Sequence, residues 1–117
     1  MTLTSSVPVL RVSDYPRARS FWTGPLGFTV REEAGEPTGF GILRSGHATV
    51  FLIAYDGPEA RYDRWRAYFH TTDLDGIAAR LGEADVRFRG PKVTDYGMRE
   101  VEVTDPDGNV VCFGQDA

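Results

Sequence analysis

Residues 97–113, GMREVEVTDPDGNVVCF, predict two antiparallel strands joined by a tight turn. Residues 100–103 alternate glutamate with valine, which is the period-two pattern of a half-buried strand. Residues 105–109, Asp-Pro-Asp-Gly-Asn, favour a turn, since Pro presets φ, Gly permits positive φ, and Asp and Asn bond to local backbone. Residues 110–113 then return as an apolar strand that carries the single cysteine, Cys112.

This hairpin ends the second of two similar halves of the chain. An apolar strand at 7–12 precedes Ser13-Asp14 and a helical segment at 17–22, and a strand at 67–71 precedes Thr72-Asp73 and a helical segment at 77–81. Because Asp is a favoured helix N-cap, Asp14 and Asp73 predict the two helix starts. Glycines predict the helix ends, at Gly24 or Gly27 in the first half and at Gly82 in the second.

Each helix is followed by three segments with strand character. In the first half they span 28–32, 39–43 and 49–54, and in the second half 86–89, 97–103 and 110–113. Because the features recur in one order, the sequence predicts an internal duplication. We expect an α+β fold in which two tandem βαβββ modules, about 5–55 and 65–115, form one domain over residues 1–117. The expected architecture is a cupped mixed sheet with its helices outside.

The composition restricts the classes of partner. The chain has 117 residues, a net charge of −4 and no block of Lys or Arg, so nucleic acid is an unfavoured partner. One cysteine cannot form an internal disulfide, which favours a cytoplasmic protein. No stretch approaches the roughly 20 apolar residues that cross a bilayer, so we expect no membrane insertion.

The sequence resembles the vicinal oxygen chelate superfamily, which includes glyoxalases, extradiol dioxygenases, fosfomycin-resistance enzymes and bleomycin-resistance proteins. The resemblance rests on Val7-Pro8-Val9-Leu10, on Phe21-Trp22 with Leu26-Gly27-Phe28, on Thr72-Asp73-Leu74-Asp75, and on the hairpin from Arg99-Glu100 to Phe113. The opening strand, the spacing of the aromatic residues and the hairpin look closest to the bleomycin-resistance branch.

The resemblance also implies where a metal site would lie. Metal-using members take His or Glu ligands from the first and last strands of a module, and these positions align with Val7, Arg66 and Cys112. Valine offers no lone pair, arginine is a permanent cation, and one thiol is a single ligand. We therefore expect no metal and no cofactor.

Strand periodicity selects candidate groove residues in the second half. Arg66, Tyr68 and His70 alternate with an apolar set that should pack beneath a helix. His70 is interpreted as a hydrogen-bonding wall residue, with a general base as the alternative. Cys112 is interpreted as a small residue of the groove floor, with a nucleophile as the alternative.

Acidic and aromatic residues complete the candidate site. Glu100 and Glu102 share a strand face and should attract a cationic ligand or pair with arginines, and acid–base catalysis is a third possibility. Phe40 and Tyr96 match aromatic positions that, by the family resemblance, stack on the flat heteroaromatic tail of a drug. The opposing interpretation is that both rings simply pack.

The sequence-based hypothesis is a non-catalytic small-molecule binding protein that sequesters an antibiotic of the bleomycin type. The expected assembly is a homodimer, because open strand edges favour pairing with a second chain. The alternative is an enzyme of the same fold, a lyase, isomerase or dioxygenase, acting on an unknown substrate.

Overall fold

The computed structural model describes residues 2–57 and 64–117 and contains two four-stranded mixed sheets with one helix each. Sheet I has the order β1-β4-β3-β2, and sheet II has the order β5-β8-β7-β6. The first half contains β1 (Val9–Val12), α1 (Tyr15–Thr23), β2 (Thr29–Ala34), β3 (Phe40–Ser45) and β4 (Ala48–Ala54). The second half contains β5 (Trp65–His70), α2 (Leu74–Glu83), β6 (Phe88–Val93), β7 (Met98–Thr104) and β8 (Val110–Asp116). The α+β fold with two β-α-β-β-β halves is thus confirmed.

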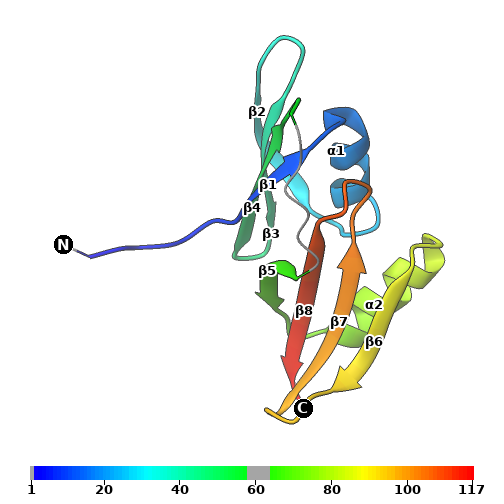
Figure 1. Ribbon diagram of the computed structural model, residues 1–117. Coiled ribbons are helices and arrows are strands. Elements are labelled where there is room, and N and C mark those ends of the chain that lie inside the picture. The colour runs from blue at the N-terminus through cyan, green and yellow to red at the C-terminus, as the bar shows by residue number, and fades with distance from the viewer. Residues whose placement is uncertain (1, 58–63) are drawn as a thin grey trace.

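Both helices lie on the same side of the molecule, so each sheet has a helix-covered face and an open face (Figure 1). In each half the first strand runs parallel to the last, while the other pairs are antiparallel. The helix of each half is therefore a crossover that carries the chain from the first strand at one edge of the sheet to the second strand at the other edge. The described strands form no closed barrel.

The two helices begin where the sequence predicts. Asp14 accepts a hydrogen bond from the backbone N–H of Arg17 at 3.1 Å, and Asp73 accepts one from Gly76 at 3.0 Å. Each carboxylate therefore satisfies one of the unpaired amides of a first helical turn. The helices also end near the predicted glycines, since α1 is capped at Gly24 and α2 ends at Glu83, directly after Gly82, with Ala84 as its cap.

One aromatic core joins the two halves. The ring of the fully buried Trp22 lies 5.0 Å from Phe28 and 6.3 Å from Phe69, centroid to centroid. Phe69 in turn stacks on Phe113 at 5.4 Å. These contacts connect α1 and the segment after it with β5 and β8, so that the helix-covered faces of both sheets share one core.

The turn at 105–109 is also a contact between the halves. Asp107 accepts hydrogen bonds from the backbone N–H and the hydroxyl of Ser13, at 2.7 and 2.6 Å. It also forms an ion pair with Arg17 at 3.0 Å. Asn109 donates to the carbonyl of Arg11 at 2.9 Å. Burial raises the pKa of Asp105, against the opposing effect of its hydrogen bonds from Asn109, Asp107 and Trp22. The turn therefore anchors the start of α1 as well as reversing the chain.

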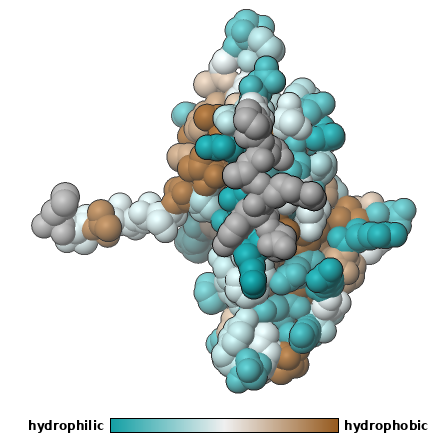
Figure 2. All heavy atoms as spheres, viewed as in Figure 1, coloured by the Kyte–Doolittle hydropathy of each residue, from teal (hydrophilic) through white to brown (hydrophobic). Residues whose placement is uncertain are grey.

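The open face of sheet I is apolar. Alternation with the buried Leu10, Leu43 and Leu52 places a second set of side chains on the open side, in cross-strand register with one another. The apolar members of this set are Val9, Phe40, Ile42, Phe51 and Ile53. Figure 2 shows hydrophobic residues gathered over sheet I, beside the point where the N-terminal segment leaves the body. Val9 is 57% exposed and Ile53 is 40% exposed, whereas Phe40, Ile42 and Phe51 are partly buried, so the described chain leaves this surface only partly covered.

Most predicted strands have bounds that differ by one to four residues from those in the structure, and two of them bear on the site. The strand expected at 86–89 spans 88–93 and contains a register shift between Arg89 and Lys92, where Gly90 has φ 102° and Pro91 offers no N–H. An edge strand tolerates such an interruption because its outer side forms no ladder. The strand expected at 67–71 spans 65–70, so that Thr71 lies outside it.

Candidate functional site

The open face of sheet II carries a row of aromatic rings along β5. The indole of Trp65 lies 5.1 Å from the ring of Tyr68, and Tyr68 lies 5.2 Å from the imidazole of His70, centroid to centroid. Tyr68 leans across Gly114 of β8, where a Cβ atom would collide with the phenol oxygen. Glycine at 114 thus makes room for the tyrosine ring on the sheet surface.

Two carboxylates of β7 are held by this row and by Tyr96. The phenol of Tyr68 donates to Glu100 Oε2 at 2.9 Å, and the phenol of Tyr96 donates to the same oxygen at 2.5 Å. The indole N–H of Trp65 donates to Glu102 Oε1 at 2.7 Å. Glu100 is only 8% exposed, and these donors fix the position of its carboxylate on the sheet.

The titration behaviour of the tyrosines follows from these contacts. Burial, followed by the hydrogen bond to Glu100 and its negative charge, holds the pKa of Tyr68 well above its ordinary value. The hydrogen bond to Glu100 raises the pKa of Tyr96 to about 12. Both phenols therefore stay protonated and keep donating to the carboxylate throughout the physiological pH range.

Cys112 lies on the floor between these groups. In register it is flanked by Tyr68 on β5 and Glu102 on β7, and it is fully buried. Burial, together with the charges of Glu100 and Glu102, raises the pKa of the Cys112 thiol to about 12. Because a nucleophilic cysteine needs a lowered pKa, this environment supports the interpretation of Cys112 as a floor residue.

The structure brings together most of the predicted site residues, with two exceptions. Tyr68, His70, Tyr96, Glu100, Glu102 and Cys112 share the open face of sheet II. Phe40 lies instead on sheet I, where its ring contacts Phe51 edge to face at 5.4 Å. Arg66 falls within a register shift of β5 between Trp65 and Ala67, so it does not continue the row of Tyr68 and His70. Trp65 occupies that place in the row.

Arg11 does not pair with the two glutamates of β7. Its guanidinium lies 4.3 Å from the centroid of the ring of Tyr55, which follows β4, while Glu100 and Glu102 accept hydrogen bonds from phenols and an indole. His47 is exposed in the turn between β3 and β4.

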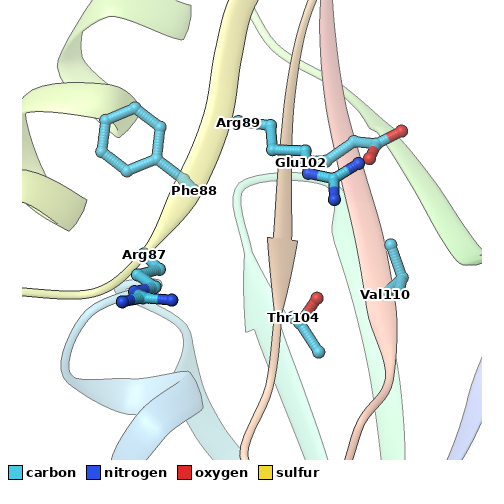
Figure 3. Close-up of a pocket in the computed structure, with 6 residues that line it drawn as sticks. All are labelled: Arg87, Phe88, Arg89, Glu102, Thr104 and Val110. Carbon is cyan, nitrogen blue, oxygen red and sulfur yellow. The ribbon is translucent and has the colours of Figure 1, made fainter.

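A shallow cavity of about 440 Å³ opens on sheet II, beside the aromatic row (Figure 3). It is lined by Arg87, Phe88, Arg89, Glu102, Thr104 and Val110. Of these, only Glu102 is among the residues predicted from the sequence. Figure 3 shows the ring of Phe88 on the side of α2, while Arg89 extends in the other direction, toward Glu102.

Within residues 2–57 and 64–117, no three His, Cys, Asp or Glu side chains are grouped as metal ligands would be. The aligned positions hold Val7 ahead of β1, Arg66 in β5 and Cys112 in β8, which together cannot supply a ligand set. That the protein binds no metal stays a prediction. In the same described ranges, no helix has the length and apolar content needed to cross a bilayer.

The sequence profile of the glyoxalase/bleomycin resistance protein/dioxygenase superfamily matches residues 5–113. The chain belongs to this superfamily. No curated protein matches the sequence.

Three solved structures illustrate the range of this fold. TnmS3, an antibiotic binding protein from Streptomyces sp. CB03234, is 28% identical, with a TM-score of 0.76 and 100% of both chains covered. A bleomycin-binding protein solved in complex with bleomycin is 19% identical, with a TM-score of 0.82 and coverage of 98% of this chain and 100% of that one. Lactoylglutathione lyase from Agrobacterium tumefaciens is 17% identical, with a TM-score of 0.76 and coverage of 98% and 95%. The superfamily and the fold therefore include both binding proteins and an enzyme.

Proposed function

We propose that the protein binds a flat, cationic antibiotic of the bleomycin type and sequesters it without a chemical reaction. The observation that carries the proposal is the open face of sheet II, where three aromatic rings stand in a row beside two carboxylates fixed by Tyr68, Tyr96 and Trp65. Aromatic rings stack on flat ligands without needing hydrogen-bond partners, and the carboxylates attract a positive group.

The groups on this face favour binding over catalysis. The high pKa of Cys112 makes it a poor nucleophile at neutral pH. Glu100 already accepts two phenol hydrogen bonds, which suits a fixed anion better than a group that exchanges protons during a reaction. The likeness to TnmS3 and to the bleomycin-binding protein supports the same choice.

We further propose that the protein acts as a homodimer in the cytoplasm. Burying an apolar side chain that is exposed in the monomer contributes about 1.5–3 kcal/mol. The open face of sheet I presents such side chains, including Val9 and Ile53, and a second copy of the chain would cover them. In this arrangement Phe40, which lies on sheet I, joins the ligand site across the interface, and Arg66 lies near its margin.

Calorimetric titration with bleomycin tests the ligand proposal. We expect saturable binding that weakens as salt is raised, since part of it is electrostatic. Trp65→Ala removes both a ring and the hydrogen bond to Glu102, and we expect it to raise Kd at least tenfold. Tyr96→Ala should raise Kd several-fold, while Tyr96→Phe, which keeps the ring, should have a smaller effect.

His47→Ala is the matched surface control and should leave Kd unchanged, because this side chain is exposed in the turn between β3 and β4. Absence of binding at high micromolar bleomycin, or binding that ignores both aromatic substitutions, would contradict the proposal. The enzyme alternative, a lyase, isomerase or dioxygenase with displaced catalytic groups, would then be preferred.

A further inference from the structure

The cavity on sheet II contains two cationic side chains that the proposed function does not use. The guanidinium groups of Arg87 and Arg89 form no ion pair or hydrogen bond with any residue of the described ranges. The guanidinium groups of Arg17, Arg19 and Arg99 are each paired with a carboxylate. Both side chains are exposed, and strand alternation directs them to the open face while Phe88 between them packs against the core.

The surroundings of Arg89 explain why it remains unpaired. Arg89 and Glu102 are cross-strand neighbours in the β6–β7 register, so an ion pair between them would be the ordinary outcome. Glu102 is held instead by the indole of Trp65, on the opposite side, at 2.7 Å. The hydrogen bond from β5 therefore keeps the carboxylate on the side of the aromatic row and leaves a guanidinium facing the cavity.

The other cavity walls define the rest of the ligand. Val110 and the methyl group of Thr104 are apolar, and the hydroxyl of Thr104 can donate a hydrogen bond. Two guanidinium groups and a hydroxyl suit a carboxylate or sulfonate, because the planar guanidinium donates two parallel hydrogen bonds to such groups. The apolar walls suit a flat ring attached to that anion.

We propose that this cavity is a binding site for an aromatic acid, with Arg87 and Arg89 holding its carboxylate or sulfonate and with the ring against Val110 and Thr104. The two arginines of this cavity attract a negative group, whereas the carboxylate of Glu100 attracts a positive one. A ligand with an acid at one end and a cation at the other would occupy both, but the cavity site does not depend on antibiotic binding.

A pair of fluorescent probes that differ in one charged group tests the proposal. 8-Anilinonaphthalene-1-sulfonate has the sulfonate, and N-phenyl-1-naphthylamine has the same rings without it. For the R87Q/R89Q variant we expect Kd for the sulfonate to rise about tenfold, which corresponds to about 1.4 kcal/mol, while Kd for the neutral amine stays the same. Benzenesulfonate should displace the sulfonate probe from the wild-type protein.

Arg31→Gln is the surface-charge control, because it removes one positive charge, half of that lost in R87Q/R89Q, from an exposed position of β2 on the other sheet. It should leave both affinities unchanged. Backbone amide shifts in an NMR titration with benzenesulfonate should concentrate at residues 87–89 and 104.

Three results would overturn the proposal: a wild-type protein that does not bind the sulfonate, an R87Q/R89Q variant that binds it as tightly as wild type, or an equal loss with Arg31→Gln, which would indicate general charge attraction. Failure here leaves the bleomycin titration untouched, since that test depends on Trp65 and Tyr96, and failure of that titration leaves this site intact.

Discussion

The two sheets have the same strand order and opposite chemistry on their open faces. On sheet I the row Val9, Phe51 and Ile42 is apolar over three strands and ends in Glu32 at its outer edge. On sheet II the corresponding cross-strand row is Tyr68, Cys112 and Glu102, with Arg89 at its outer edge. An identical backbone thus presents an aliphatic and aromatic surface in one half and a polar, aromatic surface in the other.

The difference between the two open faces shows how the two copies of a duplicated unit can take different functions. The helix-covered faces are nearly interchangeable, since the buried pair Leu10 and Leu52 in sheet I has the buried counterpart Phe69 and Phe113 in sheet II. The fold needs those faces to be apolar, whereas it places no such demand on the open faces. The open face of sheet I can therefore serve association, and that of sheet II can serve ligand binding.

The largest expected effect is a difference in the free energy of unfolding between substitutions on the helix-covered face and on the open face of one strand. Leu52 and Ile53 are adjacent in β4, but Leu52 is fully buried and Ile53 is 40% exposed. We expect Leu52→Ala to lower the free energy of unfolding by about 2–5 kcal/mol, since it leaves a cavity in a packed core. Ile53→Ala should lower it by about 1 kcal/mol or less in dilute protein. Urea unfolding followed by circular dichroism measures both.

Protein concentration sharpens this test. The loss for Leu52→Ala should be similar at all concentrations, whereas the loss for Ile53→Ala should grow with concentration if a second copy covers the face. Equal losses for the two substitutions in dilute protein would show that the open face is packed in the monomer, which would contradict the comparison.

The next effect concerns association. Phe51→Arg places a charge in the middle of the apolar row, and we expect the micromolar dimer to dissociate, with its Kd raised tenfold or more. Val93→Arg is the matched control, because Val93 is 63% exposed on the outer strand of sheet II and pairs with Arg99 on the helix-covered side. Analytical ultracentrifugation distinguishes the two. A wild-type protein that is monomeric at tens of micromolar would refute the dimer.

Most of the architecture could be predicted from the sequence because its signals are local. The two Asp N-caps, the alternation in residues 100–103 and the turn at 105–109 each act through neighbouring backbone, and all three are in the structure as expected. The packing of that turn against Ser13 and Arg17 was not predictable, since contacts across 90 and 94 residues leave no periodic pattern in one sequence.

The candidate site shows where counting along a strand is insufficient. Steps of two from His70 lead through Tyr68 to Arg66, but a register shift between Trp65 and Ala67 puts Trp65 in the row instead. Arg89 was missed for another reason, because it lies inside the strand predicted at 86–89 but only its pairing with Glu102 across the sheet places it at the cavity. The first error arose from a local loss of register, and the second from a contact between distant segments.

The smallest expected effect tests the buried floor of sheet II through pH. The pKa of Cys112 is about 12 in the folded protein, against an ordinary value of 9.0, because burial and the charges of Glu100 and Glu102 disfavour the thiolate. The unfolded chain therefore loses its thiol proton at lower pH than the folded protein. The stabilising contribution is fully present below pH 9 and is lost as pH rises from 9 toward 12. At pH 10 the loss should be on the order of 1 kcal/mol.

The raised pKa values of Tyr68 and Tyr96 also lower the free energy of unfolding as pH rises, but at higher pH than the thiol. Comparison with a cysteine-free variant therefore separates the contribution of the thiol from that of the tyrosines. We expect the urea midpoint of wild type to fall between pH 8 and pH 10 and that of Cys112→Ala to fall less, after allowance for its lower stability at pH 8. Alkylation by iodoacetamide should be slow at pH 8 in the folded protein and fast in urea. An equal fall in both midpoints, or rapid alkylation of the folded protein, would show that the thiol is not shielded by the site above it.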